Sequence, residues 1–398
     1  MSSIFDHIIE RRGTNSLKWD YCQQFFQTDD LLPMWVADAD WSSPPEIIEA
    51  IVARAKHGVF GYTRPGQELD QVIVEWVNRH YHWEIKPEWL VYIAGVVSAL
   101  NLAIKAVTSP GDEIIVQSPV YYPFFGAVKN NGAQLLNNQL LLVDQQYHMN
   151  FEHLAGLFKV KAEERRQPRV KMAILCNPHN PVGRVWTEEE LRRFGEICLE
   201  HGVLVVTDEI HADFIYTGQK FTPFASVSPD FVQNSITLLA PSKTFNIAGL
   251  NSSLAIIPDQ KTRKLFQQAG EGFTPAGNIL GFEAMKAAYS RCDYWLEKQL
   301  SYLESNLDFA MDFISSKMPL IKAIKPEGSY LLWLDCRQLS LNGKELNTFM
   351  AKRAKVALDP GDWFGPGGEG FMRINIACPR SLLKEGLERI AAALSERR

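Results

Sequence analysis

The chain has 398 residues, of which 46% are hydrophobic and 22% are charged, and this is the composition of an ordinary globular protein. Its length exceeds what one hydrophobic core usually serves, so we expect two domains or one large domain with a smaller partner. The formal net charge of −5, without a basic run, argues against a nucleic-acid-binding protein.

The N-terminus and the cysteines favour a cytoplasmic protein. The opening "MSSIFDHIIERRG" is charged and amphipathic and lacks the apolar core of a signal peptide. No stretch approaches the ~18 consecutive apolar residues of a membrane span, so we expect no membrane contact. The six cysteines are scattered, with no Cys or His cluster at ligand spacing, and we expect free thiols and no metal site.

The first predicted helix follows about 40 residues without a clear period. Ser43 can cap it, Pro44 and Pro45 fit its first turn, and Gly58 can end it.

From there short apolar strands alternate with helices. A helix is expected at 187–202, because Thr187 and Glu190 form a capping box and Gly202 can stop it. Strands are expected at 90–94, 113–117, 171–176, 203–208, 236–240 and 253–257. Continuous Val/Ile/Leu strands separated by helices predict a mostly parallel sheet covered on both faces.

The pattern changes after about residue 290. A helical stretch at 281–317 leads to two strands, 329–336 and 371–378, that alternate apolar and polar residues. Such alternation predicts an antiparallel sheet with one solvated face. An amphipathic helix at 381–394 closes the chain. The sequence thus predicts a large α/β domain followed by a smaller α+β domain.

Chemically distinctive residues follow the predicted strands of the large domain. In open α/β sheets ligands bind beyond the carboxyl ends of the strands. The residues delivered there are Gly95, Val96, Val97, Ser98, Tyr121, Asn180, Asp208, His211, Ser242 and Lys243. Each has a structural explanation when taken alone, such as Asp208 capping the next helix or His211 lying in the core. Together they converge on one site.

The residue types at that site fit pyridoxal phosphate. A helix N-terminus after Gly95 suits a phosphate, and the aldehyde needs an amine, here Lys243. The ring nitrogen stays protonated beside a buried carboxylate, which Asp208 can supply. Tyr121 can stack on the ring, and Asn180 can hydrogen-bond its phenolic oxygen. A nicotinamide site fits less well, because the glycine-rich run at 365–370 precedes a strand rather than opening a helix.

Several motifs carry a family likeness over nearly the whole chain. "NPHNPVG", "TDEIHADF", "APSKTFNIAGL" and "MRINIACPR" resemble the fold-type I pyridoxal-phosphate enzymes of the class I/II aminotransferase superfamily. "RRGTNSLKWD", "PMWVADADW" and "GVVSALNLAI" resemble its cystathionine β-lyase branch, the MalY/PatB type. The resemblance implies an aspartate-aminotransferase-like fold, with a mostly parallel seven-stranded sheet in the large domain. It divides the chain into an N-terminal segment (1–45), a large cofactor-binding domain (46–285) and a small C-terminal domain (286–398).

The resemblance also implies roles for matched residues. Lys243 would form the Schiff base with the cofactor, Asp208 would pair with the pyridine nitrogen, and Tyr121 would stack on the ring. Asn180 would contact the phenolic oxygen with His211 close by, and Val96, Val97 and Ser242 would hold the phosphate. Tyr62 would reach a neighbouring subunit's phosphate, which implies a homodimer. Arg373 would bind the substrate carboxylate near Ala37, since a guanidinium can clamp a carboxylate with two hydrogen bonds.

The expected activity is a carbon–sulfur β-lyase that cleaves cystathionine or other cysteine S-conjugates to a thiol, pyruvate and ammonia. An aminotransferase remains the alternative, because it shares Lys243, Asp208 and Arg373. A regulatory protein acting through protein contacts is a third hypothesis. Many relatives place an arginine at the position of Asn251, and its absence here is shared by the lyase branch. Lys243 and Tyr121 both remain candidates for protonating the departing sulfur.

Overall fold

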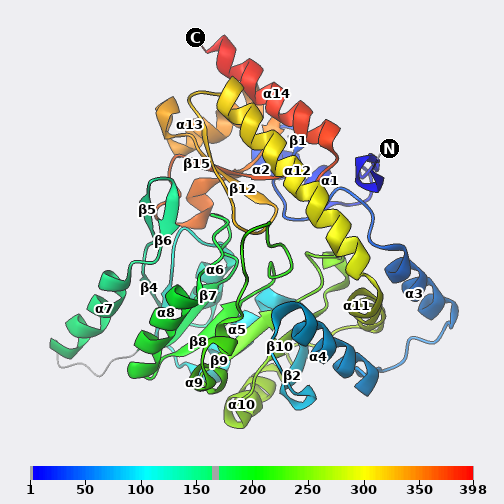
Figure 1. Ribbon diagram of the computed structural model, residues 1–398, viewed down its shortest axis with the longest axis vertical. Coiled ribbons are helices and arrows are strands. Elements are labelled where there is room, and N and C mark those ends of the chain that lie inside the picture. Colours follow the sequence, from blue (N-terminus) through cyan, green and yellow to red (C-terminus); the bar gives the residue numbers. More distant parts are fainter. Residues whose placement is uncertain (1–2, 164–169, 398) are drawn as a thin grey trace.

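A seven-stranded sheet forms the centre of the larger part of the molecule (Figure 1). The structure is a computed structural model, and it describes residues 3–163 and 170–397. In spatial order the strands are β2 (Leu90–Ile93), β10 (Ser253–Ile256), β9 (Ser235–Leu239), β8 (Leu204–Asp208), β7 (Val170–Cys176), β3 (Glu113–Val116) and β4 (Gln134–Asn137). Strand β10 is antiparallel to both neighbours, and β9, β8, β7, β3 and β4 run parallel. The predicted mostly parallel sheet is confirmed.

Helices cover both faces of this sheet. One face packs on α5 (Val96–Val107), α6 (Pro123–Asn130) and α10 (Gln260–Gly270), and the other packs on α7 (Phe151–Glu163), α8 (Glu188–Glu200) and α9 (Pro229–Gln233). Successive residues of β7 alternate between the two layers: Met172 and Ile174 join the first core cluster, while Ala173 and Leu175 join the second. Because both faces are buried, the strands read as continuous apolar runs.

A further group of helices packs beside the β2 and β10 edge of the sheet (Figure 1). It contains α3 (Pro45–Lys56), α4 (Gln67–Tyr81) and α11 (Ile279–Arg291), with α11 in contact with both others. The predicted helical stretch at 281–317 is divided at Cys292, where α11 ends and α12 (Asp293–Lys317) begins.

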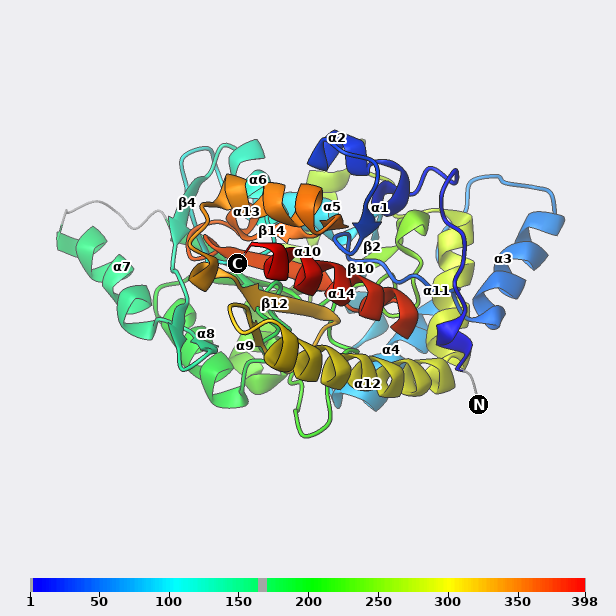
Figure 2. The same ribbon diagram turned by 90° about the horizontal axis from the view of Figure 1, so that it is seen from above.

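The C-terminal part is built on a four-stranded antiparallel sheet. Its strands lie in the order β11 (Lys322–Ile324), β12 (Leu331–Asp335), β15 (Phe371–Asn375) and β14 (Asp359–Pro360). Helices α12 and α14 (Arg380–Glu396) lie side by side over it (Figure 2), and α13 (Gly343–Thr348) lies nearby.

The expectation that this small sheet has a solvated face is wrong. All of β15 and all but the last residue of β12 are buried. Leu332 and Leu334 of β12 join the core cluster that contains α12 and α14, while Trp333 packs in the cluster of the large sheet. The polar residues that produced the alternation, Arg373 and Asn375, are buried because they bind the N-terminal segment.

Two predicted helix boundaries had different outcomes. The capping box of α8 is confirmed, since Glu190 N donates to Thr187 Oγ1 at 3.2 Å and Thr187 N donates to Glu190 Oε2 at 2.9 Å. The expected cap at Ser43 is wrong. Pro44 takes the N-cap position of α3, and the Ser43 hydroxyl donates to the carbonyl of Asn246 at 3.2 Å.

The N-terminal segment runs along the small sheet and reaches the large one. It contains short helices at α1 (Leu17–Asp20) and α2 (Cys22–Phe26), and its strand β1 (Leu32–Pro33) pairs in parallel with β13 (Val356–Ala357). The domain boundaries at 45 and 285 stay a prediction.

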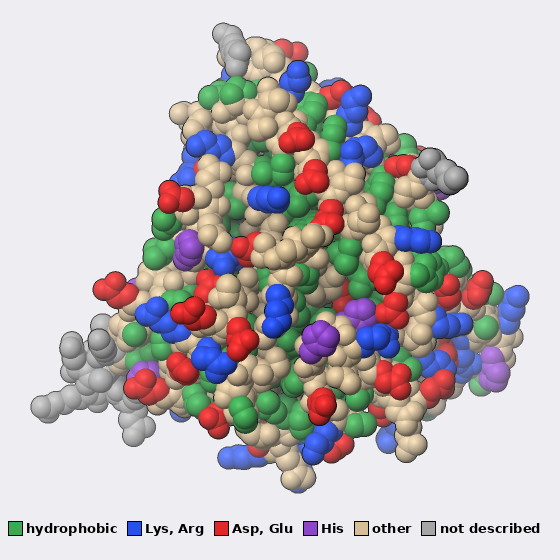
Figure 3. All heavy atoms as spheres, viewed as in Figure 1, with side chains coloured by type: hydrophobic (Ala, Val, Ile, Leu, Met, Phe, Trp, Pro, Cys, Tyr) green, Lys and Arg blue, Asp and Glu red, His purple; other side chains and the backbone are tan. Residues whose placement is uncertain are grey.

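The surface shows no concentration of one charge on the face in Figure 3, where basic and acidic side chains are interspersed. All six cysteines are buried with free thiols. Within the described residues, no helix is both long and apolar enough to cross a membrane. The same residues contain no cluster of His, Cys, Asp and Glu that could hold a metal ion.

Candidate active site

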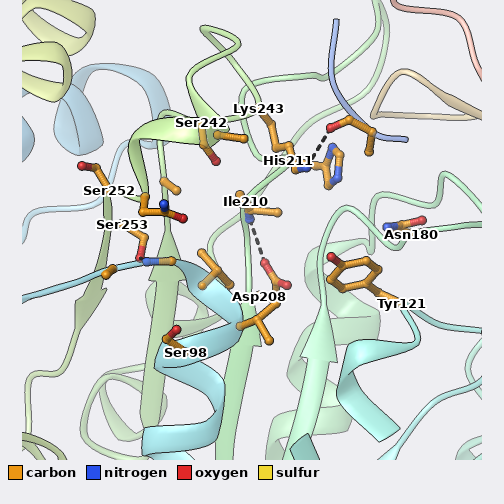
Figure 4. Close-up of a pocket in the computed structure, with 18 of the residues that line it drawn as sticks. Ser98, Tyr121, Asn180, Asp208, Ile210, His211, Ser242, Lys243, Ser252 and Ser253 are labelled. Carbon is orange, nitrogen blue, oxygen red and sulfur yellow. Dashed lines mark hydrogen bonds between the residues drawn. The ribbon is translucent and has the colours of Figure 1, made fainter. Parts of the chain in front are cut away.

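A cavity of about 330 Å³ lies at the carboxyl ends of the central strands (Figure 4). It receives residues that are far apart in the sequence, from the ends of β2, β3, β7, β8 and β9 and from the N-terminal segment. The predicted site residues on its wall are Ala37, Val96, Val97, Tyr121, Asn180, Asp208, His211, Ser242 and Lys243. Arg373 and Tyr62 are not on this wall, and the functional roles of all these residues stay predictions.

Lys243 projects into the cavity from the turn after β9. The turn is anchored by its neighbour Thr244, whose hydroxyl donates to Asp213 Oδ2 at 2.5 Å. The Lys243 amine donates to the carbonyl oxygen of Ala37 at 2.8 Å (Figure 4). Burial lowers the pKa of Lys243 to about 8, although the nearby Asp38 charge raises it. An amine with this pKa can gain or lose a proton near neutral pH.

Asp208 ends strand β8 and is buried in the floor of the cavity. Its Oδ1 accepts a hydrogen bond from the backbone N–H of Ile210 at 3.1 Å (Figure 4). Burial raises the pKa of Asp208 to about 6, while this hydrogen bond and the Lys243 charge oppose the rise. A carboxylate in such a site favours a cationic partner.

His211 lies close to Asp208 and Lys243 in the same wall. Its Nδ1 is 3.1 Å from the Ser329 hydroxyl. Burial, with the charges of Lys243 and Arg373, holds the pKa of His211 well below its usual range. The ring is therefore neutral at physiological pH.

The N-terminus of α5 forms another part of the wall. Gly95 precedes the helix with φ of +102°, a conformation that favours glycine, and no side chain caps the helix. The first backbone N–H groups of a helix lack intrahelical partners and carry a partial positive charge. Ser98 and Ser242 also line the cavity, Ser98 on α5 and Ser242 at the far end beside Lys243 (Figure 4). This arrangement suits a bound anion such as a phosphate.

Two loops bring Tyr121 and Asn180 to the opposite side of the cavity (Figure 4). They are tied together by His179, whose Nε2 lies 2.9 Å from the carbonyl oxygen of Pro119. Burial raises the pKa of Tyr121, so its hydroxyl keeps its proton. The Tyr121 ring can stack on the face of a planar heterocycle bound here, and the Asn180 amide can form a hydrogen bond at its edge.

Arg373 lies behind Asn180 rather than on the cavity wall. Its Nη1 donates to Asn180 Oδ1 at 2.9 Å, and its Nη2 donates to the carbonyl of Trp35 at 3.1 Å and to the carboxylate of Asp359. Burial raises the pKa of Asp359 to about 6, although Arg373 opposes this. The guanidinium Nε is buried and has no hydrogen-bond partner among the described residues.

Tyr62 lies in the exposed connection between α3 and α4, and its side chain is fully exposed. It does not reach the cavity of its own chain. Its neighbours Val59 and Phe60 are also exposed, which is unusual for large apolar side chains so close together.

Sequence reasoning missed how the N-terminal segment is held over the cavity. Residues 36–41, here called the strap, are bound by Asn375, whose Nδ2 donates to the carbonyls of Val36 and Asp38 at 2.7 Å each. On the other side Asn246 Nδ2 donates to the carbonyls of Ala39 and Trp41 at 3.0 and 2.8 Å.

An ionic network beneath the strap was also missed. Lys18 and Arg11 bind Asp40 at 2.6 Å each, and both also contact Asp38. The dense charges of "RRGTNSLKWD" and "ADAD" were visible in the sequence, but their pairing required the fold. The Tyr330 hydroxyl, which donates to the carbonyl of Ala37 at 3.0 Å, gave no sequence signal beyond its place in a strand.

Comparison with known proteins found a matching family profile and similar proteins along nearly the whole chain. The sequence profile of aminotransferase class I and II matches residues 36–390. The chain is 47% identical to "Cystathionine beta-lyase PatB" of Bacillus subtilis (strain 168) over 392 residues, which cover 98% of this chain and all of that protein.

Solved structures give the same grouping. Cystalysin from Treponema denticola, whose crystal structure contains a pyridoxal 5′-phosphate cofactor, superposes with a TM-score of 0.94 and 36% identity, covering all of both chains. A PLP-bound putative aminotransferase from Clostridium difficile 630 superposes with a TM-score of 0.94 and 44% identity, covering 98% of this chain and 99% of that one.

Proposed function

The chain belongs to the aminotransferase class I and II family, and on this basis we propose that it is a pyridoxal-phosphate-dependent carbon–sulfur β-lyase. Its substrates would be cystathionine or other cysteine S-conjugates, cleaved to a thiol, pyruvate and ammonia. The observation that carries the proposal is the shared cavity of Lys243 and Asp208, a lysine of lowered pKa facing a buried carboxylate. The full-length similarity to a cystathionine β-lyase supports the lyase reaction in particular.

The residues around the cavity fit pyridoxal phosphate. The backbone N–H groups of Val96 and Val97 at the uncapped N-terminus of α5, with the Ser242 hydroxyl, would hold the phosphate. The Lys243 amine would bind the aldehyde carbon, and Asp208 would pair with the protonated ring nitrogen. Tyr121 would stack on the ring.

Bound there, the cofactor supplies an electron-accepting ring that stabilises negative charge on the substrate Cα. The Lys243 amine, freed once the substrate's amino group takes its place on the aldehyde carbon, would take the Cα proton, because its pKa of about 8 leaves part of it unprotonated at neutral pH. Asp208 stays ionised above its pKa of about 6 and so keeps its negative charge at the pH of the reaction.

The departing sulfur needs a proton once its bond to Cβ breaks. The ammonium form of Lys243 can return the proton that it took from Cα. The Tyr121 hydroxyl is the second donor, because burial keeps it protonated. Either donor leaves a neutral thiol, which is a better leaving group than a thiolate in a site shielded from water.

Arg373 would orient the substrate by its α-carboxylate. Asp359 and Trp35 fix the guanidinium behind Asn180, on the side of the cavity where that carboxylate would lie. The contact between Arg373 and Asn180 links the carboxylate site to the cofactor site.

We place Tyr62 in the phosphate site of a second subunit, so that the active form is a homodimer with shared sites. The supporting observation is the fully exposed Tyr62 side chain beside exposed Val59 and Phe60 on a connection that lacks a core of its own. The free, buried thiols of all six cysteines support a reducing compartment such as the cytoplasm.

Aminotransferase activity is the second candidate, because a putative aminotransferase is 44% identical over 98% of this chain. The two reactions share proton removal at Cα and differ in whether sulfur then leaves. Only the aminotransferase reaction needs a keto-acid acceptor for continued turnover, so dependence on a keto acid distinguishes the two activities.

The test is pyruvate release from L-cystathionine by cofactor-loaded protein without a keto acid. Sustained pyruvate and thiol formation that is lost in Lys243→Ala is expected. Turnover that requires a keto acid would assign the chain to the aminotransferases. No turnover under either condition would leave a regulatory role, and in that case Lys243→Ala would keep its biological effect.

A further inference from the structure

The two segments that bring Asp208 and Lys243 to the cavity leave the large sheet side by side. Strands β8 and β9 are parallel neighbours, and their register ends with Asp208 opposite Leu238. At this end Glu209 N donates to the carbonyl oxygen of Leu238 at 3.0 Å. Beyond these residues the ladder of backbone hydrogen bonds no longer fixes the distance between the two segments.

A side-chain contact joins the two segments again further along. The Thr244 hydroxyl donates to Asp213 Oδ2 at 2.5 Å, and both residues are buried. Among the described residues, no other hydrogen bond connects residues 209–217 with residues 240–250. Because Asp213 lies in the turn that follows Asp208, this contact links the lysine turn to the segment of the buried carboxylate.

Asp213 is itself held by a third element. The Tyr81 hydroxyl, at the end of α4, donates to Asp213 Oδ1 at 2.5 Å, and Trp76 Nε1 donates to the Tyr81 hydroxyl at 3.4 Å. Both aromatic side chains are buried, and the Trp76 ring packs against the rings of Phe245 and Tyr289. Each carboxylate oxygen therefore accepts one hydroxyl proton, and the carboxylate has a defined place.

The chemistry of this contact favours a need for fixed geometry. Asp213 accepts from two neutral hydroxyls, and within the described residues it forms no ion pair with a Lys or Arg side chain. Burying a carboxylate without a cationic partner costs free energy, so the contact is an expensive way to stabilise a fold. A carboxylate accepts at both oxygens, whereas an amide of the same shape accepts at one, so only the acid can take both hydroxyl protons this way.

The lysine is held at its other end by the strap. The Lys243 amine donates to the Ala37 carbonyl oxygen at 2.8 Å, inside the cavity (Figure 4). Neither Asp213 nor Thr244 is on the cavity wall, so neither would touch a bound ligand. Their contact acts on the amine only through the position of the turn.

We propose that Asp213 is a positioning residue for Lys243: by holding Thr244, it sets the distance between the lysine turn and the segment of Asp208, and so the place of the amine in the cavity. The inference deepens the proposed function, in which the amine and the Asp208 carboxylate act in one cavity. The hydrogen bond itself is present whether or not the reaction proceeds.

The test follows the Lys243 amine in the full-length chain freed of cofactor. Brief pulses of an amine-acylating reagent are given across a range of pH, and modified Lys243 is quantified by mass spectrometry against the exposed Lys220. Burial lowers the pKa of Lys243 to about 8, so the labelling midpoint of the unaltered chain is expected near that pH. Thr244→Val keeps the shape of the side chain but removes the hydroxyl. The released turn should let the amine reach water, so the midpoint should rise by about one pH unit.

The groups that face the amine are unaltered in this variant. They are Asp38, Asp208 and Arg373, which are charged, and His211, which is neutral. A shifted midpoint therefore reports a change in the position of the amine and not the loss of a charge. A role in stability alone would lower the free energy of unfolding and leave the midpoint of the folded chain unchanged.

Thr244→Ser is the rescue variant, because it restores the hydroxyl, and its midpoint should equal that of the unaltered chain. Tyr92→Phe is the matched control. The Tyr92 hydroxyl donates to Asp70 Oδ1 at 2.6 Å, a comparable contact that does not involve the lysine turn. Its midpoint should also stay unchanged. Circular dichroism verifies that each variant is folded.

Asp213→Leu removes both acceptors at once. It should raise the midpoint as Thr244→Val does, and the double variant should show no further rise, because both changes remove the same hydrogen bond. If Asp213→Leu does not fold, the pair of Thr244 variants carries the test. An unchanged midpoint in folded Thr244→Val, or an equal rise in Thr244→Ser or Tyr92→Phe, would overturn the proposal. Because labelling needs neither cofactor nor turnover, a chain without lyase activity would refute the proposed function and leave this inference standing.

Discussion

Lys18 is buried, whereas Lys243 is partly buried on the cavity wall, and the two amines have different surroundings. Lys18 is 1% exposed, and its amine lies 2.6 Å from Asp40 and 3.6 Å from Asp38. The Lys243 amine donates to the neutral carbonyl of Ala37. Burial alone would lower the pKa of Lys18, but the charges of Asp40 and Asp38 outweigh it and raise the pKa. For Lys243 burial prevails, and the pKa falls to about 8.

The difference shows what separates a structural buried lysine from a reactive one. A buried amine that is fully paired with carboxylates stays charged and contributes to the fold. A buried amine whose positive charge is only partly balanced by nearby carboxylates exchanges its proton near neutral pH, as a base or a nucleophile must. The two lysines are linked through Asp38, which contacts the first and influences the second.

The largest expected effect is on activity. Lys243→Ala removes the base, so pyruvate release from L-cystathionine should fall by at least about 10³-fold. Initial rates with saturating cofactor measure this effect. Retention of about a tenth of the rate would show that another group removes the proton.

Lys18→Met should instead act on stability. It leaves the buried Asp40 with one cationic partner fewer, and breaking a buried ion pair on one side costs about 3–5 kcal/mol. Denaturant unfolding of the cofactor-free chain measures the change in the free energy of unfolding. The exposed Lys220→Met is the control, with an expected change below about 0.5 kcal/mol. Equal effects of the two variants would refute the structural role of Lys18.

Lys243→Met should shift stability in the opposite direction. In the folded, cofactor-free chain the amine has a pKa of about 8 against an ordinary 10.5, so burial of its charge destabilises the fold. The variant should be more stable at neutral pH by about 1–2 kcal/mol. Between about pH 8 and 10.5 the Lys243 amine is largely neutral in the folded chain but protonated in the unfolded chain. The difference in the free energy of unfolding between Lys243→Met and the unaltered chain should therefore shrink as the pH rises through this range. A destabilised variant at neutral pH would contradict this account.

The smallest expected effect is in the pH profile of kcat. Because Lys243 must be unprotonated to take the Cα proton, kcat should rise with pH and level off above about 8. Below about pH 6 it should fall more steeply, since Asp208 also becomes protonated. Stopped-time assays of pyruvate across this range measure the profile. A kcat that does not change between about pH 6 and pH 8 would exclude Lys243 as the rate-determining base.

Much of the fold followed from local patterns. The six predicted strands of the large sheet all formed within one or two residues of their expected ends, because each is a continuous apolar run buried on both faces. The antiparallel insertion of β10 and the short β4 were not anticipated, since pairing direction depends on chain connections rather than on composition. Arg373 and Asn375 misled the interpretation of the small sheet, because their polarity serves the N-terminal segment and not solvent.

The sequence predicted which strand ends deliver residues to the cavity, but it did not predict the contacts between those residues. Asp208 and Lys243 follow buried strands, and the rule that ligands bind at carboxyl ends places them together. The Ala37 carbonyl, Tyr330 and the pairing of Lys18 depend on the path of the N-terminal segment across both sheets. That path has no periodic sequence signal, so it emerged only from the structure.

The central claim is that Lys243, and not the more deeply buried Lys18, is the amine that carries the chemistry. The most direct measurement is borohydride reduction of the cofactor-loaded protein, followed by peptide mass spectrometry to locate the pyridoxyl group. The account predicts about one pyridoxyl group per chain, on Lys243, with Lys18 unmodified. A pyridoxyl group on another lysine, or none at all, would contradict it.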